Sequence, residues 1–300
     1  MIAEIAYQDN WIDILSTNFM RNAFLGGTLV ALAAGVVGYF VVIRRDSFAA
    51  HALAHIGFPG ATGAVLIGAP VTLGLAVFCI AGGFAIGALG KRADRREVAT
   101  GTILALATSL GVLFASMATR STNTVTSVLF GNLLAISEGQ LVAFALFTAA
   151  LLAGVGVIAR PLLFASINPQ VAEAKGVPVR MLGMAFMIML AVVVTMAVQV
   201  VGTLLLFALI VTPAATAIAI TARPSAVVGI ATGIGLTAVW TGLVLSAMFN
   251  LPPSFPIVAI TFVGWAGTLV ATREARGHHA NRQVPTGGHH HVDQPVDLSI

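Results

Sequence analysis

The stretch MRNAFLGGTLVALAAGVVGYFVVIRRD, residues 20–46, decides the fold. Residues 20–43 form one apolar run, and Arg44, Arg45 and Asp46 end it. A helix that crosses the hydrocarbon core of a bilayer needs about 20 apolar residues. The run is long enough to cross, and the two arginines stand where such a helix would meet water on the cytoplasmic side.

The whole chain has this character. Hydrophobic residues make up 58% of its 300 residues, charged residues only 9%, and the mean hydropathy is +0.98. Soluble domains carry about 25% charged residues, so this chain has too few to cover a surface that faces water. We predict an all-α integral membrane protein. The net charge of +4 does not indicate nucleic-acid binding, because Lys and Arg lie in short clusters between apolar runs.

Apolar runs separated by polar breaks predict nine transmembrane helices, with eight to ten allowed. Pro59 and Gly60 interrupt the second run, so we expect an irregular helix there. The predicted spans are 20–43, 48–68, 71–90, 99–118, 140–159, 181–200, 203–221, 226–248 and 256–271.

The basic residues predict the orientation. With the N-terminus outside and the C-terminus in the cytoplasm, only Arg21 and Arg120 are external. The other basic residues are then cytoplasmic, as the positive-inside rule requires: Arg44, Arg45, Lys91, Arg92, Arg95, Arg96, Arg160, Lys175, Arg180, Arg223, Arg273, Arg276 and Arg282. We divide the chain into an extracytoplasmic surface segment (1–18), a transmembrane domain (19–271) and a disordered, histidine-containing cytoplasmic tail (272–300).

The second span carries the sharpest chemical signal, HALAHIGFPG at residues 51–60. His51 and His55 stand four apart and so share one helix face. Two neutral imidazoles form half of a first-row metal site, although one or both could instead bond a neighbouring helix. Pro59 and Gly60 follow, and they indicate either a simple kink or a broken helix that lines a substrate site. A zinc protease is disfavoured, because Ala52 stands where H-E-x-x-H has its glutamate.

Two further groups of residues have both a functional and a structural interpretation. Gln199, Thr212, Pro213 and Thr216 are candidates for gating, or polar contacts between helices. The tail histidines could bind metal loosely or have no function; they are His278, His279, His289, His290 and His291.

INPQVAEAKGVPVR, residues 167–180, is the longest polar cytoplasmic insertion. Asn168 can cap a short helix that begins at Pro169, and Gly176 can stop it in a left-handed conformation. Such a helix could dock into another protein, or the stretch could be an ordinary loop. No phosphate-binding loop is present: at Gly90-Lys91 the pattern fails, since Ala85 and Arg92 replace its glycine and its Ser/Thr. Transport driven by ATP would therefore need a separate motor chain.

Taken together, these pieces resemble the membrane permease of the bacterial zinc/manganese/iron ABC importers. The second span is similar to that family's S-L-x-G-D-A-L-S-H-x-x-x-P-G motif. Residues 129–135 are similar to L-F-G-N-[IL]-L-A, residues 168–176 to D-P-E-x-A-x-x-x-G, and residues 199–216 to Q-x-V-G-x-L-L…P-A-A-T. The ordered similarity covers about residues 19–271.

The resemblance implies a type II importer-like permease in the bacterial cytoplasmic (inner) membrane, embedded in lipid. It implies a homodimer without a permanently bound cofactor, two cytoplasmic ATPases, and an extracytoplasmic protein that delivers the metal. It also implies that Asn168, Pro169, Gln170, Ala172 and Gly176 couple to the ATPase. His55 matches the metal-binding histidine of the family.

Two departures from the family pattern affect the expected chemistry. His51 replaces the usual aspartate, which favours zinc over manganese, with manganese or iron as alternatives. Asn168 and Gln170 replace Asp and Glu, which alters the charge of the ATPase contact. The competing class is an ion-coupled secondary carrier, but such carriers usually place Asp or Glu inside the membrane, and the apolar runs contain neither.

Overall fold

The structure is a computed structural model that describes residues 11–88, 93–118 and 121–281. The described chain is helical throughout. The helices are α1 (Trp11–Leu15), α2 (Asn18–Ile43), α3 (Ser47–Leu66), α4 (Val71–Ala88), α5 (Ala93–Met117), α6 (Ser121–Phe130), the 3₁₀ turn η1 (Leu133–Ala135), α7 (Glu138–Ile167), α8 (Pro169–Ala174), α9 (Val179–Ile220), α10 (Pro224–Phe249) and α11 (Ser254–Asn281).

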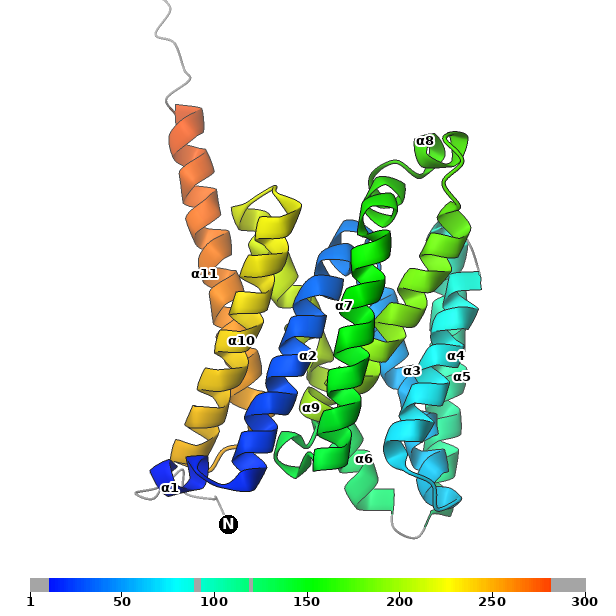
Figure 1. Ribbon diagram of the computed structural model, residues 1–300, viewed down its shortest axis with the longest axis vertical. Helices are drawn as coiled ribbons and strands as arrows, with labels where there is room; N and C mark the ends of the chain where they lie inside the picture. Colours follow the sequence, from blue (N-terminus) through cyan, green and yellow to red (C-terminus); the bar gives the residue numbers. More distant parts are fainter. Residues whose placement is uncertain (1–10, 89–92, 119–120, 282–300) are drawn as a thin grey trace, which may run out of the picture.

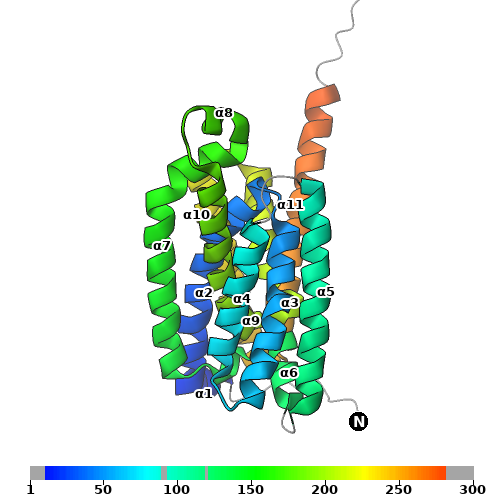
Figure 2. The ribbon, with the colours of Figure 1, turned by 90° about the vertical axis from the view of Figure 1, so that its right-hand side faces the viewer.

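The long helices lie side by side along one axis (Figures 1 and 2). α1, α6 and the start of α7 lie at one end of the bundle, and α8 lies at the other, where α11 also finishes (Figure 1). We call these the α1 end and the α8 end. α2 packs against α7, α9 and α10 at the centre, while α3, α4 and α5 form a neighbouring group (Figure 2).

α9 reverses its direction at Gly202, which has non-helical torsion angles (φ 81°, ψ 170°). Its first arm passes Arg44, at the α8 end of α2, close to Gly183. Its second arm passes the same part of α2, where a Cβ on Gly38 would overlap the carbonyl of Ile210. Both ends of α9 therefore lie near the α8 end (Figure 1), and the predicted spans 181–200 and 203–221 correspond to its two arms.

Within the described residues, seven helices are long and apolar enough to cross a membrane. α3 falls below the hydropathy of the others because it contains two imidazoles and a proline, and the apolar segment Leu205–Ile220 is shorter than a full span. The predicted number of nine includes these two segments. The seven are Asn18–Ile43, Val71–Ala88, Glu97–Met117, Glu138–Ile167, Val179–Thr203, Pro224–Phe249 and Ser254–Thr272.

The expected irregularity at Pro59 and Gly60 is wrong, because α3 runs without a break from Ser47 to Leu66. A proline inside a helix removes one backbone hydrogen bond, and here the packing around it holds the helix together. Both residues are buried. A Cβ on Gly60 would overlap the carbonyl of Gly74 in α4, and a Cβ on Gly74 would overlap the carbonyl of Gly60. The glycine thus allows two helix backbones to touch rather than ending a helix.

The structure describes only part of the two predicted terminal segments, 1–18 and 272–300. α1 begins at Trp11, so most of the predicted surface segment, residues 1–10, lies outside the described residues. α11 continues to Asn281, so 272–281 is helical where a disordered tail was expected. His278 and His279 belong to that helix, whereas His289, His290 and His291 lie outside the described residues.

Candidate metal pathway

His51 and His55 lie one turn apart on α3. Their ring centroids are 4.8 Å apart with an edge-to-face angle of 70°, and both residues are half-buried. A rise of 1.5 Å per residue places them about 8 and 14 Å along the helix from Asp46. In a hydrocarbon layer about 30 Å thick that begins at Asp46, His55 would lie close to the middle. Proline has no N–H, so residue 59 leaves the carbonyl oxygen of His55 without its usual helical donor.

The pair lies on the side of α3 that faces α5. Thr62 shares this face by helical spacing, and its hydroxyl donates a 3.2 Å hydrogen bond to the carbonyl of Gly111 in α5. The opposite side of α3 faces α4, where the thiol of buried Cys79 lies 3.5 Å from the carbonyl of Leu53. α5 itself has an open outer face, since only 17% of its apolar segment is buried.

One chain supplies only part of a metal site. Across residues 11–88, 93–118 and 121–281, no group of three or more His, Cys, Asp or Glu side chains is close enough to hold a metal ion. First-row metals take four or more ligands in stable sites. The two imidazoles therefore suit a cation that passes through, or a site that a second molecule completes.

Two motifs that are far apart in the sequence meet at the α1 end. The backbone N–H of Asn132 donates to the carbonyl of Gln199 over 3.0 Å. Gly131 and Gly202 lie against each other, both with positive φ (77° and 81°). A Cβ on Gly131 would lie 2.6 Å from the nitrogen of Gly202, so neither position has room for a side chain.

Gln199 also joins three helices beside an open cavity. Its Oε1 accepts hydrogen bonds from the hydroxyl of Thr72 in α4 (2.9 Å) and from Nε2 of Gln140 in α7 (3.0 Å). Ser137 orients the Gln140 amide, because its backbone N–H donates to Gln140 Oε1 over 3.0 Å. The cavity has a volume of about 250 Å³, and Asn132 also lines it.

Thr72 and Gln140 were not predicted from the sequence. The sequence does contain a signal for Gln140, because the spacing S-x-x-Q at residues 137–140 predicts a capping box. The structure has this capping box at the start of α7. Thr72 has no such signal, because a threonine shortly after Pro70 is typical of an ordinary helix start.

Thr212, Pro213 and Thr216 lie on the second arm of α9. The hydroxyl of Thr216 donates to the carbonyl of Thr212 within the helix (2.8 Å), and Pro213 is buried. Neighbouring Ala214 packs against Gly38 of α2. These contacts fit the interpretation of helix packing, and gating by these residues stays a prediction.

The predicted short helix at 168–176 is confirmed as α8. The Asn168 side chain accepts from the N–H of Val171 (3.1 Å), and Pro169 occupies the first turn. Gly176 ends the helix with φ 80°. Of the residues 168–176 only Ala172 is buried, and α8 stands at the far end of the bundle (Figure 1), so its surface is free to contact another chain.

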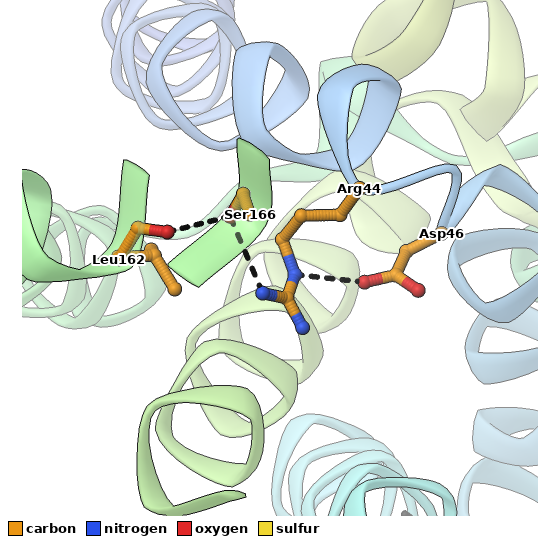
Figure 3. A network of polar contacts seen from close by, with 4 residues as sticks. All are labelled: Arg44, Asp46, Leu162 and Ser166. Carbon is orange, nitrogen blue, oxygen red and sulfur yellow. Dashed lines mark hydrogen bonds and ion pairs between the residues drawn. The ribbon is translucent and has the colours of Figure 1, made fainter. Parts of the chain in front are cut away.

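A larger cavity, of about 790 Å³, lies beside α8. Arg44, Asp46, Glu97, Asn168, Gln170 and Arg180 are among the residues that line it. Figure 3 shows a polar network at its wall. Nε of Arg44 donates to Oδ2 of Asp46 over 3.0 Å, and Nη1 of Arg44 donates to Oγ of Ser166 over 3.3 Å. The Ser166 hydroxyl in turn donates to the carbonyl of Leu162 over 2.6 Å.

Comparison with known proteins agrees with this architecture. Residues 16–269 match the ABC 3 transport family. The chain is 29% identical over 263 residues to the "Manganese transport system membrane protein MntC" of Listeria innocua, covering 87% of this chain and 94% of that one. It is 27% identical to the "Manganese import system permease protein ScaB" of Streptococcus parasanguinis, covering 88% and 94%.

Two solved structures share the fold. One is "PsaBC from Streptococcus pneumoniae in complex with Fab", with a TM-score of 0.77, 28% identity, and coverage of 86% of this chain and 94% of that one. The other is an inward-facing "putative metal-chelate type ABC transporter", with a TM-score of 0.67, 15% identity, and coverage of 84% and 86%.

A family match over most of the chain sets aside the ion-coupled carrier and the protease. It also agrees with the missing phosphate-binding loop, since ATP hydrolysis in such transporters is the task of another chain. The apolar helices, the exposed α8 and the matched family lead to one conclusion: this chain belongs to the ABC-3 transport family and is a multi-pass membrane permease subunit of a metal ABC transporter.

Proposed function

We propose that this permease carries a divalent first-row transition metal into the cell past His51 and His55. The observation that carries the proposal is the pair itself, two imidazoles with centroids 4.8 Å apart near the middle of α3. Polar residues at this depth are costly and default to a functional role. Two neutral ligands would hold a cation weakly enough to release it.

We further propose that two copies of the chain complete the site. In the described residues one chain brings two ligands and no third His, Cys, Asp or Glu near them, and both histidines are only half-buried on their side of α3. Two chains that meet along this side would supply four imidazoles. A homodimer with the pathway at its interface therefore accounts for the half-exposed pair.

In the orientation that we propose, the α1 end faces outward, the α8 end faces the cytoplasm, and the chain crosses nine times. The turns that join α2 to α3 and α9 to α10 lie at the α8 end (Figure 1), and they contain Arg44, Arg45 and Arg223. The positive-inside rule assigns such turns to the cytoplasm. The nine passes comprise the seven apolar helices, α3 and the short second arm of α9.

The partners that we propose follow from the two ends. α8 has an exposed surface that includes Val171 (43% exposed), and it would dock into a cytoplasmic ATPase. Asn168, Pro169, Gln170, Ala172 and Gly176 shape this helix and its two ends. At the opposite end an extracytoplasmic binding protein would deliver the metal.

Two cargoes have specific support. The named relatives are manganese transporters, which favours manganese. The imidazole at position 51 favours zinc, because nitrogen ligands suit zinc better than manganese. Iron is the third member of the same class of metals. The metal is the transported substrate, and we propose no permanently bound cofactor.

Uptake of radioactive manganese and zinc would test the proposal. The assay uses cells without importers of their own that express this chain with its ATPase and binding protein. His55→Ala should abolish uptake of the physiological metal at unchanged protein level, and His51→Asp should shift the preference toward manganese. The matched control His278→Ala/His279→Ala removes two imidazoles from α11 and should leave uptake unchanged. Full uptake by His55→Ala would refute metal passage at the pair.

A further inference from the structure

We propose that Arg44 is a positioning residue that couples α8 to the histidine helix α3. The inference rests on the proposed function, since it assumes that α8 docks on an ATPase and that the metal passes α3. Arg44 touches neither the metal nor the ATPase in this account. It acts by connecting the end of α7, which leads into α8, to the start of α3, which contains His51.

The first step is that α2 and α3 are joined by a rigid corner. The N–H of Asp46 bonds the carbonyl of Val41 (2.9 Å), and the N–H of Arg45 bonds the carbonyl of Val42 (3.2 Å). Arg45 has φ 57°, so this is a Schellman turn with an arginine at the left-handed position. A movement of Asp46 therefore moves the start of α3 as well.

The second step is that α8 is fixed to the last turn of α7. The N–H of Asn168 bonds the carbonyl of Phe164 (3.1 Å), while the Asn168 side chain caps α8 (3.1 Å). Ser166 lies in that last turn, two residues before Asn168. A movement of α8 caused by a docked partner would therefore also move Ser166.

The third step is that one guanidinium connects these two units. Arg44 is bonded to Asp46 at the corner and to Ser166 on α7 (Figure 3). Its Cζ also lies 4.9 Å from the ring centroid of Phe186 on the first arm of α9. The side chains of Arg44 and Asp46 are only 13% and 5% exposed, so water competes weakly for these bonds.

The chemistry of arginine suits this role. Its planar fork presents Nε to one partner and Nη1 to another at the same time, whereas the single ammonium of lysine is a point charge. The ion pair with Asp46 anchors the fork, and the bond to the neutral Ser166 hydroxyl is the weaker one. Movement of α7 would therefore pull the corner through a contact that can break and reform during a transport cycle.

Proteoliposomes that contain the permease, its ATPase and the binding protein provide the test, in which both metal uptake and ATP hydrolysis are measured. For Ser166→Ala we expect metal uptake per ATP to fall about tenfold, as expected for loss of a hydrogen bond to a charged group, while basal ATP hydrolysis stays near wild type. Arg44→Lys should show the same uncoupling. Ser166→Thr keeps the hydroxyl and should restore uptake per ATP.

Thr268→Val in α11 is the matched control, because it removes a hydroxyl that bonds only its own helix (2.9 Å to the carbonyl of Gly264). Wild-type uptake per ATP in both Ser166→Ala and Arg44→Lys would overturn the proposal. So would a lower melting temperature that accounts for the whole loss, since Arg44 would then only hold the fold together. If the wild-type complex imports neither manganese nor zinc, the proposed function is refuted, and the coupling proposal with it. If the wild type imports metal and both variants match it, only the coupling proposal is refuted.

Discussion

The reversal of α9 at Gly202 makes a sharp prediction about stability. Replacing Gly202 with alanine adds one methyl group where the chain turns back on itself. Gly202 has φ 81° and ψ 170°, a region that is essentially open only to glycine. The added Cβ would lie 2.5 Å from the nitrogen of Gly131 and 2.5 Å from the carbonyl carbon of Leu129. These are backbone atoms, so they cannot rotate away as the end of a side chain could.

Two contributions set the size of the effect. Holding a residue with a Cβ in this glycine-only region costs about 1–3 kcal/mol. Forcing an extra carbon into a packed region costs about 1–3 kcal/mol. Gly202→Ala should therefore lower the free energy of unfolding by about 2–6 kcal/mol. Because Gln199 lies one turn away on the same arm, the variant should also lose the bond between the Gln199 carbonyl and the N–H of Asn132.

The assay is a denaturant titration of the purified permease in mixed detergent micelles, in which the unfolded fraction is followed by circular dichroism. Gly229→Ala is the matched control, since this helical glycine in α10 has nothing within 4 Å of an added Cβ. There alanine should stabilise the protein by up to about 1 kcal/mol. If Gly202→Ala unfolds at the same denaturant fraction as wild type while Gly229→Ala is stabilised, the claim that the reversal needs glycine is refuted.

Three further predictions use the same protein. Arg45→Gly should raise the free energy of unfolding by about 1 kcal/mol in the same titration, because glycine adopts the left-handed corner without strain; an unchanged midpoint would contradict this. Gln199→Leu should lower it by about 1 kcal/mol, since Thr72 and Gln140 lose their acceptor while water can reach the open cavity; a stabilised variant would count against the network. Val171→Ser should weaken ATPase binding roughly fivefold in a pull-down with the co-expressed partner, through about 1 kcal/mol of lost apolar burial; equal recovery of the ATPase would place the docking surface elsewhere.

The long helices follow closely from the sequence, because hydrophobic length is a local property. The predicted span 226–248 lies within α10 (Pro224–Phe249), and 71–90 begins with α4 (Val71–Ala88). Helix ends at short polar turns were also predictable, as at Arg44 and Arg223. The short helix α8 was predictable for the same reason, since a cap, a proline and a glycine mark it within nine residues, 168–176.

Short helices and packing contacts were harder to predict. α6 (Ser121–Phe130) lies between the predicted spans 99–118 and 140–159 and was not predicted, because a helix of ten residues rich in Ser and Thr has no clear apolar period. It packs against α9, and tertiary contacts stabilise such short helices more than their own propensity does. The uninterrupted helix at Pro59 was equally hard to predict, since nothing near it in the sequence indicates the contact between Gly60 and Gly74.

Some features of the candidate site were predictable from local sequence, and others depend on contacts between distant segments. The spacing of His51 and His55 predicts their shared face, and the structure adds that this face is turned toward α5. The sequence motifs at 129–132 and 199–202 were separate signals, and only the fold shows that Gly131 and Gly202 form one contact. Arg44 was expected as a basic residue at the cytoplasmic boundary, and its bonds to Asp46 and Ser166 depend on α7 returning to the same place.

The position of Asp46 explains how the proposed cation path could tolerate an arginine so close to it. Asp46 directly precedes α3, about 8 Å along the helix from His51, and it is the carboxylate nearest to the pair in the sequence. An unpaired Arg44 at about 10 Å from a divalent metal would oppose it by about 3 kcal/mol at an effective dielectric constant of about 20. With the guanidinium bonded to Asp46 at 3.0 Å, most of that repulsion is cancelled. In the proposed function, the ion pair would therefore let Arg44 connect the two helices, while the part of the path near Asp46 would stay close to neutral for a metal that leaves the histidines.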